Sequence, residues 1–289
     1  MSPMNNRRMT PLAEPGILDF APGAAAAYSL RNLSLSYTGP VVTVRRSTDN
    51  AEADFTATEI SDGTLAGWAG ADGFVKQWWD QSGNARHATQ ATTGYQPQIV
   101  DSGVLVTEGG KAAISFDGVD DLLSLASPVV IGQSATADFF LFCVFSLSDL
   151  ATAKGYIWHS SNLASGSAGT DNGLLVQNEK FTWGTGSSSD AGAWLLFDLL
   201  SGSQQIASVT LDAATTTTGT KHAYINGALA ASASYAVKAS AAVTSYIGAR
   251  VDLAVQRHDG TISELIIYPT DQTALRTRIE GNLAWTYNA

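Results

Sequence analysis

The stretch Phe74–Val100, FVKQWWDQSGNARHATQATTGYQPQIV, decides the fold. It opens with an apolar, aromatic run through Trp78 and Trp79, which predicts a buried strand. The segment Asp80–Asn84 that follows combines short polar side chains with a glycine, which favours a tight turn. Residues 86–98 are polar with scattered apolar positions, so we expect an ordered surface excursion. A buried strand ending in a turn is typical of an all-β domain.

Short apolar or alternating segments, separated by turn residues, continue from Ala112–Leu123 to Gly260–Tyr268. This succession of strand, turn and strand predicts a β-sandwich. The segment Ala137–Leu147 is apolar on both faces, which predicts a central strand because edge strands avoid that pattern. Asn226 and Gly227 lie between two apolar segments and predict a hairpin turn.

Three segments predict helical structure. Leu275, Ile279 and Leu283 recur at four-residue spacing, which places them on one face of a short C-terminal helix. The run Ala24–Ala27 predicts one or two helical turns, because alanine is the best helix former. The segment Thr64–Gly70 predicts another short turn of helix. No repeat or long linker divides the chain, so we expect an N-terminal arm over residues 1–16 and one domain over residues 17–289.

The composition restricts the class of protein. The chain has 289 residues, a formal net charge of −10 and a pI near 4.7, and it shows no basic patch that would bind nucleic acid. Cys143 is the single cysteine and is expected to be a buried core residue. The N-terminal residues contain no apolar run typical of a signal peptide, and no segment approaches the ~20 apolar residues of a membrane helix. We therefore expect synthesis in a reducing cytoplasm and no membrane insertion.

Several motifs resemble known families. Two motifs resemble the start of laminin-G-like, concanavalin-like jelly-roll domains. They are W.DQSGN..HATQ, from Trp78 to Gln90, and the later FDGVDD at Phe116–Asp121. Read with Tyr37-Thr38-Gly39-Pro40, they resemble the catalytic domain of the arabinofuranosidase B family, and more closely the lectin-like modules in virion proteins of tailed bacteriophages. The resemblance implies an all-β jelly-roll β-sandwich with an N-terminal arm and a short C-terminal helix.

The resemblance to the virion modules implies a function. It predicts a non-enzymatic structural protein on the virion surface, as a capsid decoration or as a tail or fibre component, made in the host cytoplasm. The expected partners are other virion proteins, bound through the arm that contains Arg7 and Arg8, and glycans of the cell surface. We also expect a homo-oligomer. A soluble lectin and a glycoside hydrolase of the arabinofuranosidase type are the alternatives, and the arm has the alternative of a disordered terminus.

The hydrolase alternative can be tested on residues, because glycosidases use two carboxylates ~5 to ~9.5 Å apart. In the arabinofuranosidase B family a nucleophilic glutamate follows a segment in which Asn162 matches the family asparagine. Ala164 or Ser165 stands here at the position of that glutamate. Asp252 lies near the position of the family's acid aspartate but out of register, since Arg250 occupies that position. We therefore expect no enzymatic activity.

An unrelated carboxylate pair is the remaining route to hydrolysis. Its members would come from Asp171, Glu179, Asp190 and Asp259. For glycan binding without hydrolysis, an aromatic platform needs amide and carboxylate partners near loops. The residues predicted for such a site are Trp158, Asn162, Asp171, Asn172 and Asp252.

A calcium ion is the one cofactor that the sequence suggests. Calcium prefers six to eight oxygen ligands, several of them carboxylates, and Asp117, Asp120 and Asp121 cluster within a few residues. The alternative is that Asp117 and Gly118 make a hairpin turn while the other two carboxylates face solvent. The four histidines show no metal-binding spacing, so no other cofactor is expected.

Overall fold

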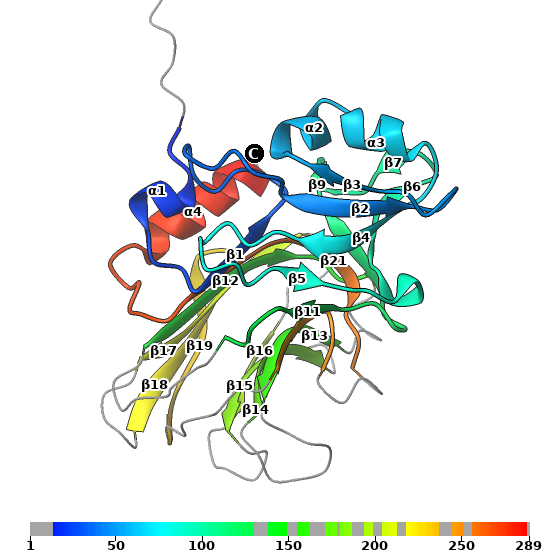
Figure 1. Cartoon of the computed structure of the whole chain (residues 1–289). Coiled ribbons are helices and arrows are strands. Elements are labelled where there is room, and N and C mark those ends of the chain that lie inside the picture. Colours follow the sequence, from blue (N-terminus) through cyan, green and yellow to red (C-terminus); the bar gives the residue numbers. More distant parts are fainter. Residues whose placement is uncertain are drawn as a thin grey trace, which may run out of the picture.

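The computed structural model describes residues 14–129, 138–148, 155–161, 171–177, 180–186, 194–198, 204–212, 218–236, 244–250 and 256–287. Within these ranges the chain is mostly antiparallel β-strand, arranged in two layers, with a short helix at its C-terminal end (Figure 1). The predicted β-sandwich and its C-terminal helix are confirmed. Arg7 and Arg8 of the predicted arm lie outside the described residues.

The first layer is organised around its longest strand, β21 (Asp259–Tyr268). One edge of β21 pairs with β12, and its other edge pairs with β1 and β10. Beyond β12 the layer continues through β17, β18 and β19. Its other strands are β1 (Ala26–Ser29), β10 (Ile114–Asp117), β12 (Phe139–Phe145), β17 (Gln205–Asp212), β18 (Thr218–Ile225) and β19 (Ala228–Ala236).

The second layer runs from β5 through β11, β20, β13, β14 and β15 to β16. Its strands are β5 (Ala88–Thr89), β11 (Leu123–Leu125), β13 (Gly155–Ser161), β14 (Asp171–Gln177), β15 (Lys180–Gly186), β16 (Trp194–Asp198) and β20 (Thr244–Ile247).

Strand β4 (Gly73–Trp78), predicted from the aromatic run, joins the two layers. Its Trp78 end pairs with β5 of the second layer, and its Gly73 end pairs with β6 (Gln98–Asp101), which leads to β10 of the first. The remaining elements pack around this junction: β2 (Val42–Arg46), β3 (Glu52–Phe55), β7 (Val104–Leu105), β8 (Thr107–Glu108), β9 (Lys111–Ala112), the helices α2 (Ala57–Ser61) and α3 (Thr64–Ala69), and a 3-10 turn, η1 (Thr93–Tyr95).

Strand β12 is buried on both faces, as its apolar sequence predicts. Phe139, Leu141 and Cys143 face the core between the layers. Phe140 and Phe142 face a second core, which α1 (Ile17–Phe20) and α4 (Arg276–Tyr287) cover from outside (Figure 1). Burial raises the pKa of the Cys143 thiol, as expected for an inert core cysteine.

The helix predictions have mixed outcomes. In α4, Ile279 and Leu283 are buried as their spacing predicts, and α3 confirms the helical turn predicted at Thr64–Gly70. The helix predicted at Ala24–Ala27 is wrong, because these residues lead into β1, which pairs with β21. Tertiary pairing has overridden alanine's helix propensity. Among the described residues no helix is both long and apolar enough to cross a bilayer.

The DQSGN motif connects β4 to the N-terminal segment. The Asp80 carboxylate accepts hydrogen bonds from the backbone N–H groups of Ala27, Ser82 and Arg86, each at 2.9 Å. The Gln81 side chain accepts from the N–H of Leu33 at 2.9 Å and donates to two carbonyls nearby. Both side chains are buried, so this signature serves the fold.

A buried ionic network joins β1, β21 and α4. Glu264 on β21 is fully buried and accepts two hydrogen bonds from the Arg31 guanidinium, at 2.9 and 3.0 Å. The hydroxyls of Ser29 and Tyr287 donate to the same carboxylate at 2.9 and 3.0 Å. Arg31 also donates to Asn282 Oδ1 at 2.8 Å. The network holds the C-terminal helix against the first layer.

Candidate functional site

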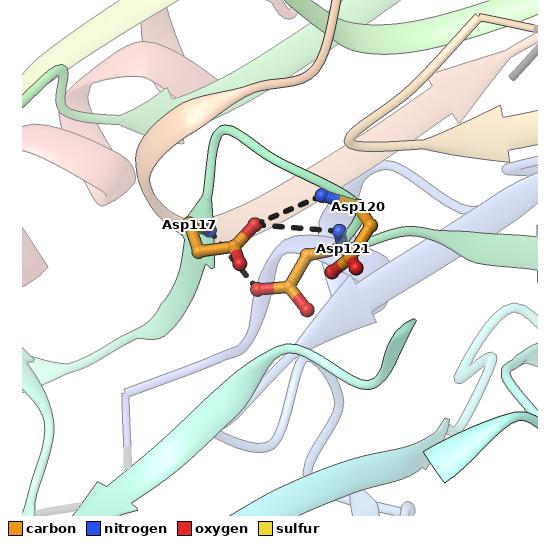
Figure 2. Close-up of side chains that lie close together, drawn as sticks. All are labelled: Asp117, Asp120 and Asp121. Atoms are coloured by element: carbon orange, nitrogen blue, oxygen red, sulfur yellow. Dashed lines mark hydrogen bonds between the residues drawn. The ribbon is translucent and has the colours of Figure 1, made fainter. Parts of the chain in front are cut away.

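The acidic turn, Asp117–Asp121, connects β10 to β11 (Figure 2). Asp117 Oδ1 accepts hydrogen bonds from the backbone N–H groups of Val119, Asp120 and Asp121, at 2.8, 3.2 and 3.4 Å. Asp121 Oδ2 accepts from the N–H of Asp117 at 3.0 Å. Asp117 therefore makes the turn, as the alternative prediction had it. Asp121, however, does not face solvent, because it is only 7% exposed.

The three carboxylates of the acidic turn are close neighbours. One ligand oxygen from each of Asp117, Asp120 and Asp121 lies within 4.8 Å of the others. Burial, and next the charge of Asp117, raise the pKa of Asp121 to about 7. Asp117 is exposed. A carboxyl with a raised pKa therefore sits beside an exposed carboxyl, an arrangement that suits a division of acid and base roles.

A groove of about 310 Å³ adjoins the acidic turn. Its floor is the outer face of β4, β6 and β10, where strand register places Phe74 beside Gln98 and Gln98 beside Ser115. Because side chains alternate along a strand, Ser115 faces outward while Ile114 and Phe116 enter the core. The rest of the lining is Thr93, Gly94, Gln96, Asp117 and Asp121.

The groove combines an aromatic ring with amides, hydroxyls and carboxylates, which suits a sugar ring. Its wall is held in place from beneath. The Arg45 guanidinium lies 4.9 Å from the centre of the Phe74 ring and donates a hydrogen bond to Gln96 Oε1 at 2.7 Å. Gln96 is 3% exposed, so its orientation is fixed by packing and by this bond.

The acidic turn lies against the segment that leads into and out of residues 251–255. The N–H of Gly118 donates to the carbonyl of His258 at 3.0 Å, and Arg257 donates to the carbonyl of Asp120 at 3.3 Å. Asp259 is the register partner of Asp117. The resemblance placed the acid aspartate near Asp252, which itself lies outside the described residues.

The predicted glycan residues do not form one site in the described structure. Trp158 is fully buried and stacks on Phe139 with ring centres 5.7 Å apart, so it belongs to the core and is not available as a sugar platform. Asp171 and Asn172 lie on β14, where the structure describes their backbone. The other predicted positions lie outside the described residues: Asn162, Ala164, Ser165, Glu179, Asp190 and Asp252.

Strand register shows where the described strands next to the predicted glycan residues begin and end. β13 and β20 are antiparallel, with Ser161 opposite Thr244 and Trp158 opposite Ile247. The chain therefore leaves β13 toward residue 162 at one end of the pair, and leaves β20 toward residue 251 at the other. Asp171 is opposite Ser161 and so belongs to the first end. Asp171 and the Ile247 end of β20 therefore lie at opposite ends of the β13–β20 pair.

The acidic turn fits proton transfer better than it fits calcium. Three backbone N–H groups already occupy Asp117 Oδ1. The turn itself offers three carboxylates toward the six to eight oxygens that calcium takes. We therefore favour an acid–base role for these three residues over the predicted calcium site.

The sequence analysis did not single out Phe74, Gln98 and Ser115 as site residues. Each is an outward position on a strand, which alternation would reveal. Their adjacency depends on the order β4, β6, β10, and this order is set by long-range pairing that no local pattern contains.

Comparisons with known proteins connect this geometry to an enzyme group. The chain is 29% identical over 203 residues to the probable alpha-L-arabinofuranosidase B of Aspergillus fumigatus, and 27% identical over 203 residues to that of Aspergillus terreus. Each match covers 63% of this chain and 38% of the relative, so the chain spans about two fifths of the curated relatives' length. No protein-family model matches.

A solved structure supports the same relationship at the level of the fold. A GH54 arabinofuranosidase, soaked with a cyclic sulfate inhibitor, superimposes with a TM-score of 0.59 at 16% identity, over 91% of this chain and 63% of that one.

These findings correct two predictions. The expected virion structural role, as capsid decoration, tail or fibre, is wrong, since these relatives are probable glycosidases and none of them is a phage protein. The expectation of a non-enzymatic protein, drawn from Ala164 and Ser165, is wrong for the same reason. The findings favour the glycoside hydrolase alternative: the chain is a homologue of the arabinofuranosidase B proteins and shares the β-sandwich of a GH54 arabinofuranosidase.

Proposed function

We propose that this chain is a glycoside hydrolase domain that cleaves arabinofuranosyl linkages. The observation that carries the proposal is the homology to two arabinofuranosidase B proteins over 203 residues. The groove beside the acidic turn is the place in the described structure where sugar-binding groups and a carboxylate pair meet.

In the proposed reaction Asp121 is the general acid and Asp117 the nucleophile. Asp117 attacks the anomeric carbon and forms a glycosyl ester, while the bond to the leaving oxygen breaks and that oxygen takes the Asp121 proton. The Asp121 carboxylate then removes a proton from water, which attacks the anomeric carbon, releases the sugar and restores Asp117. One oxygen of each carboxyl lies within 4.8 Å of the other, which is closer than the ~6.5 to ~9.5 Å of inverting enzymes, so the product should keep its anomeric configuration.

The groove would orient the sugar. The Phe74 ring offers a face for the apolar side of the furanose, and Gln98 and Ser115 offer hydrogen bonds to its hydroxyls. Gln96, which is locked by Arg45, gives this wall a fixed shape. Holding the anomeric carbon near Asp117 is the main contribution expected of these residues.

The test is turnover of an aryl α-L-arabinofuranoside by the full chain. We expect Asp121→Asn and Asp117→Asn each to lower kcat by about 10² to 10⁴-fold, as loss of an acid–base group does. Asp54→Asn, which changes an exposed carboxylate on β3, is the matched control and should leave kcat unchanged. Asp171→Asn and Asp252→Asn test the two carboxylates that the sequence predicted for the site.

The outcomes test the activity, the general acid and the nucleophile separately. Absence of turnover on aryl arabinofuranosides by the wild-type chain overturns the proposed activity. If turnover survives Asp121→Asn but disappears in Asp252→Asn, the proposed activity stands and Asp252, not Asp121, is the general acid. A product of inverted configuration excludes Asp117 as a nucleophile.

A further inference from the structure

A second groove, distant from the acidic turn, lies along α4. It measures about 380 Å³ and is lined by Glu14, Pro15, Phe20, Arg278, Asn282 and Trp285. Trp285 is 67% exposed, whereas Trp78 and Trp158 are fully buried. An exposed indole at the edge of a groove offers both an apolar face and an N–H donor, the combination that enriches tryptophan at binding surfaces.

The polar wall of this groove is fixed by the buried network. Asn282 Oδ1 accepts a hydrogen bond from Arg31 at 2.8 Å, and Arg31 is itself held by two bonds to Glu264. The Asn282 amide is therefore oriented, and among the described residues no hydrogen bond from its N–H groups is seen, so they can donate to another molecule. The Arg278 guanidinium, one helical turn before Asn282 on α4, lies 4.0 Å from the centre of the Phe20 ring, which positions this part of the lining.

The chemistry of the groove selects the kind of ligand. An indole face favours an apolar, flat surface, such as the C–H face of a sugar ring. The lining carries one carboxylate, Glu14, and one guanidinium, Arg278, so their charges offset each other and favour neither an anion nor a cation. Glu14, Arg278 and the Asn282 amide can all hydrogen-bond to hydroxyl groups.

We propose that the Trp285 groove is a second glycan-binding site, which holds a neutral polysaccharide chain away from the site of cleavage. The choice of an arabinofuranosyl polysaccharide as ligand rests on the proposed function. α4 covers the outer face of the first layer, next to α1 (Figure 1). The acidic turn instead follows β10, which pairs with β6 at the junction with β4. Binding at Trp285 and cleavage at the acidic turn are therefore separable.

The test measures binding of the full chain to soluble arabinan and arabinoxylan by affinity electrophoresis and by titration calorimetry. The Asp121→Asn background prevents cleavage during the measurement. We expect Trp285→Ala to weaken binding by about tenfold or more and Trp285→Phe to weaken it less. Leu229→Ala, at a side chain that is 58% exposed on β19, is the control and should bind like the parent.

Turnover of a small aryl arabinofuranoside is measured in parallel with Trp285→Ala in an otherwise wild-type chain. We expect it to be unchanged, because a monosaccharide substrate does not reach α4. Polysaccharide binding that is unchanged in Trp285→Ala overturns the second site. Trp285-dependent binding in a chain without any turnover supports the second site and overturns the proposed cleavage alone. Near-UV circular dichroism confirms that Trp285→Ala remains folded.

Discussion

Two buried carboxylates of this protein have opposite surroundings. Glu264 is fully buried and receives two hydrogen bonds from Arg31, one from Ser29 and one from Tyr287. Asp121 is 7% exposed, receives one backbone hydrogen bond, and has two other aspartates beside it. Burial costs both groups solvation, but Glu264 recovers it from a directly bonded guanidinium and two hydroxyl donors, whereas Asp121 has one N–H donor and the charge of Arg257 against two neighbouring aspartates.

The difference shows what a buried carboxylate can be used for. A carboxylate matched by a guanidinium and by hydroxyl donors fixes structure, which suits the join between β21 and α4. A carboxylate among like charges keeps its proton to near neutral pH, which suits proton donation. A buried carboxylate therefore stabilises the fold where its neighbours are cations and donors, and suits chemistry where its neighbours are other carboxylates.

The largest effect is expected from Glu264→Gln. The substitution leaves the Arg31 charge without its partner inside the protein. Breaking a buried pair typically costs 3–5 kcal/mol, and because the Arg31 side chain is 24% exposed we expect about 3 kcal/mol. Guanidinium unfolding of the two proteins measures this difference in free energy of unfolding.

The matched control for that substitution is Asp49→Asn. It removes a surface ion pair, Arg46–Asp49, whose side chains are 30% and 50% exposed. We expect a much smaller loss than for Glu264→Gln, because water and salt screen an exposed pair. If the two substitutions destabilise equally, the Glu264 network is not the structural join described above.

The next effect concerns pH and Asp121. Its pKa is about 7 in the folded protein against 3.8 for the ordinary group, so the folded state favours the protonated form. The stability that this gives is fully present below the ordinary pKa and is lost as pH rises through 7. Between pH 4 and 7 the free energy of unfolding should therefore fall more steeply with pH in the wild-type chain than in Asp121→Asn. Parallel pH profiles would contradict the raised pKa.

A smaller effect is expected from Asp117→Ala. Three backbone N–H groups of the acidic turn lose their acceptor, and because the turn is partly exposed water replaces some of the bonds. We expect a loss of about 1–2 kcal/mol in the free energy of unfolding. Asp117→Asn keeps an acceptor oxygen and should lose less than half as much, which separates the turn from the charge.

The smallest effect is expected from calcium. Millimolar CaCl2 or EDTA should leave the Tm unchanged, because the acidic turn suits a proton better than a cation. A calcium-dependent rise in Tm that disappears in Asp120→Asn would instead show a calcium site at the turn.

The sequence predicted those parts of the fold that local patterns encode. The apolar run of β12, the Asn226–Gly227 hairpin and the buried face of α4 each follow from residue spacing. The helix predicted at Ala24–Ala27 was wrong because β1 is a strand only through its pairing with β21, which is more than 200 residues away in sequence.

The candidate site was predictable only in part. The cluster of Asp117, Asp120 and Asp121 is visible because the three residues are neighbours in sequence. The burial of Asp121 and the groove floor of Phe74, Gln98 and Ser115 require the pairing of three separate strands. Trp158 was misjudged because sequence does not tell which face of β13 turns toward Phe139.

The position of β21 at the centre of the first layer has a consequence for how the chain acquires its structure. Strands β1, β10 and β12 all lie beside β21, although β21 begins at residue 259. During synthesis these strands must wait without their central neighbour until residues 259–268 have left the ribosome. Such high contact order predicts slow folding, on the millisecond-to-second scale of β-sandwiches or slower, with open strand edges exposed meanwhile.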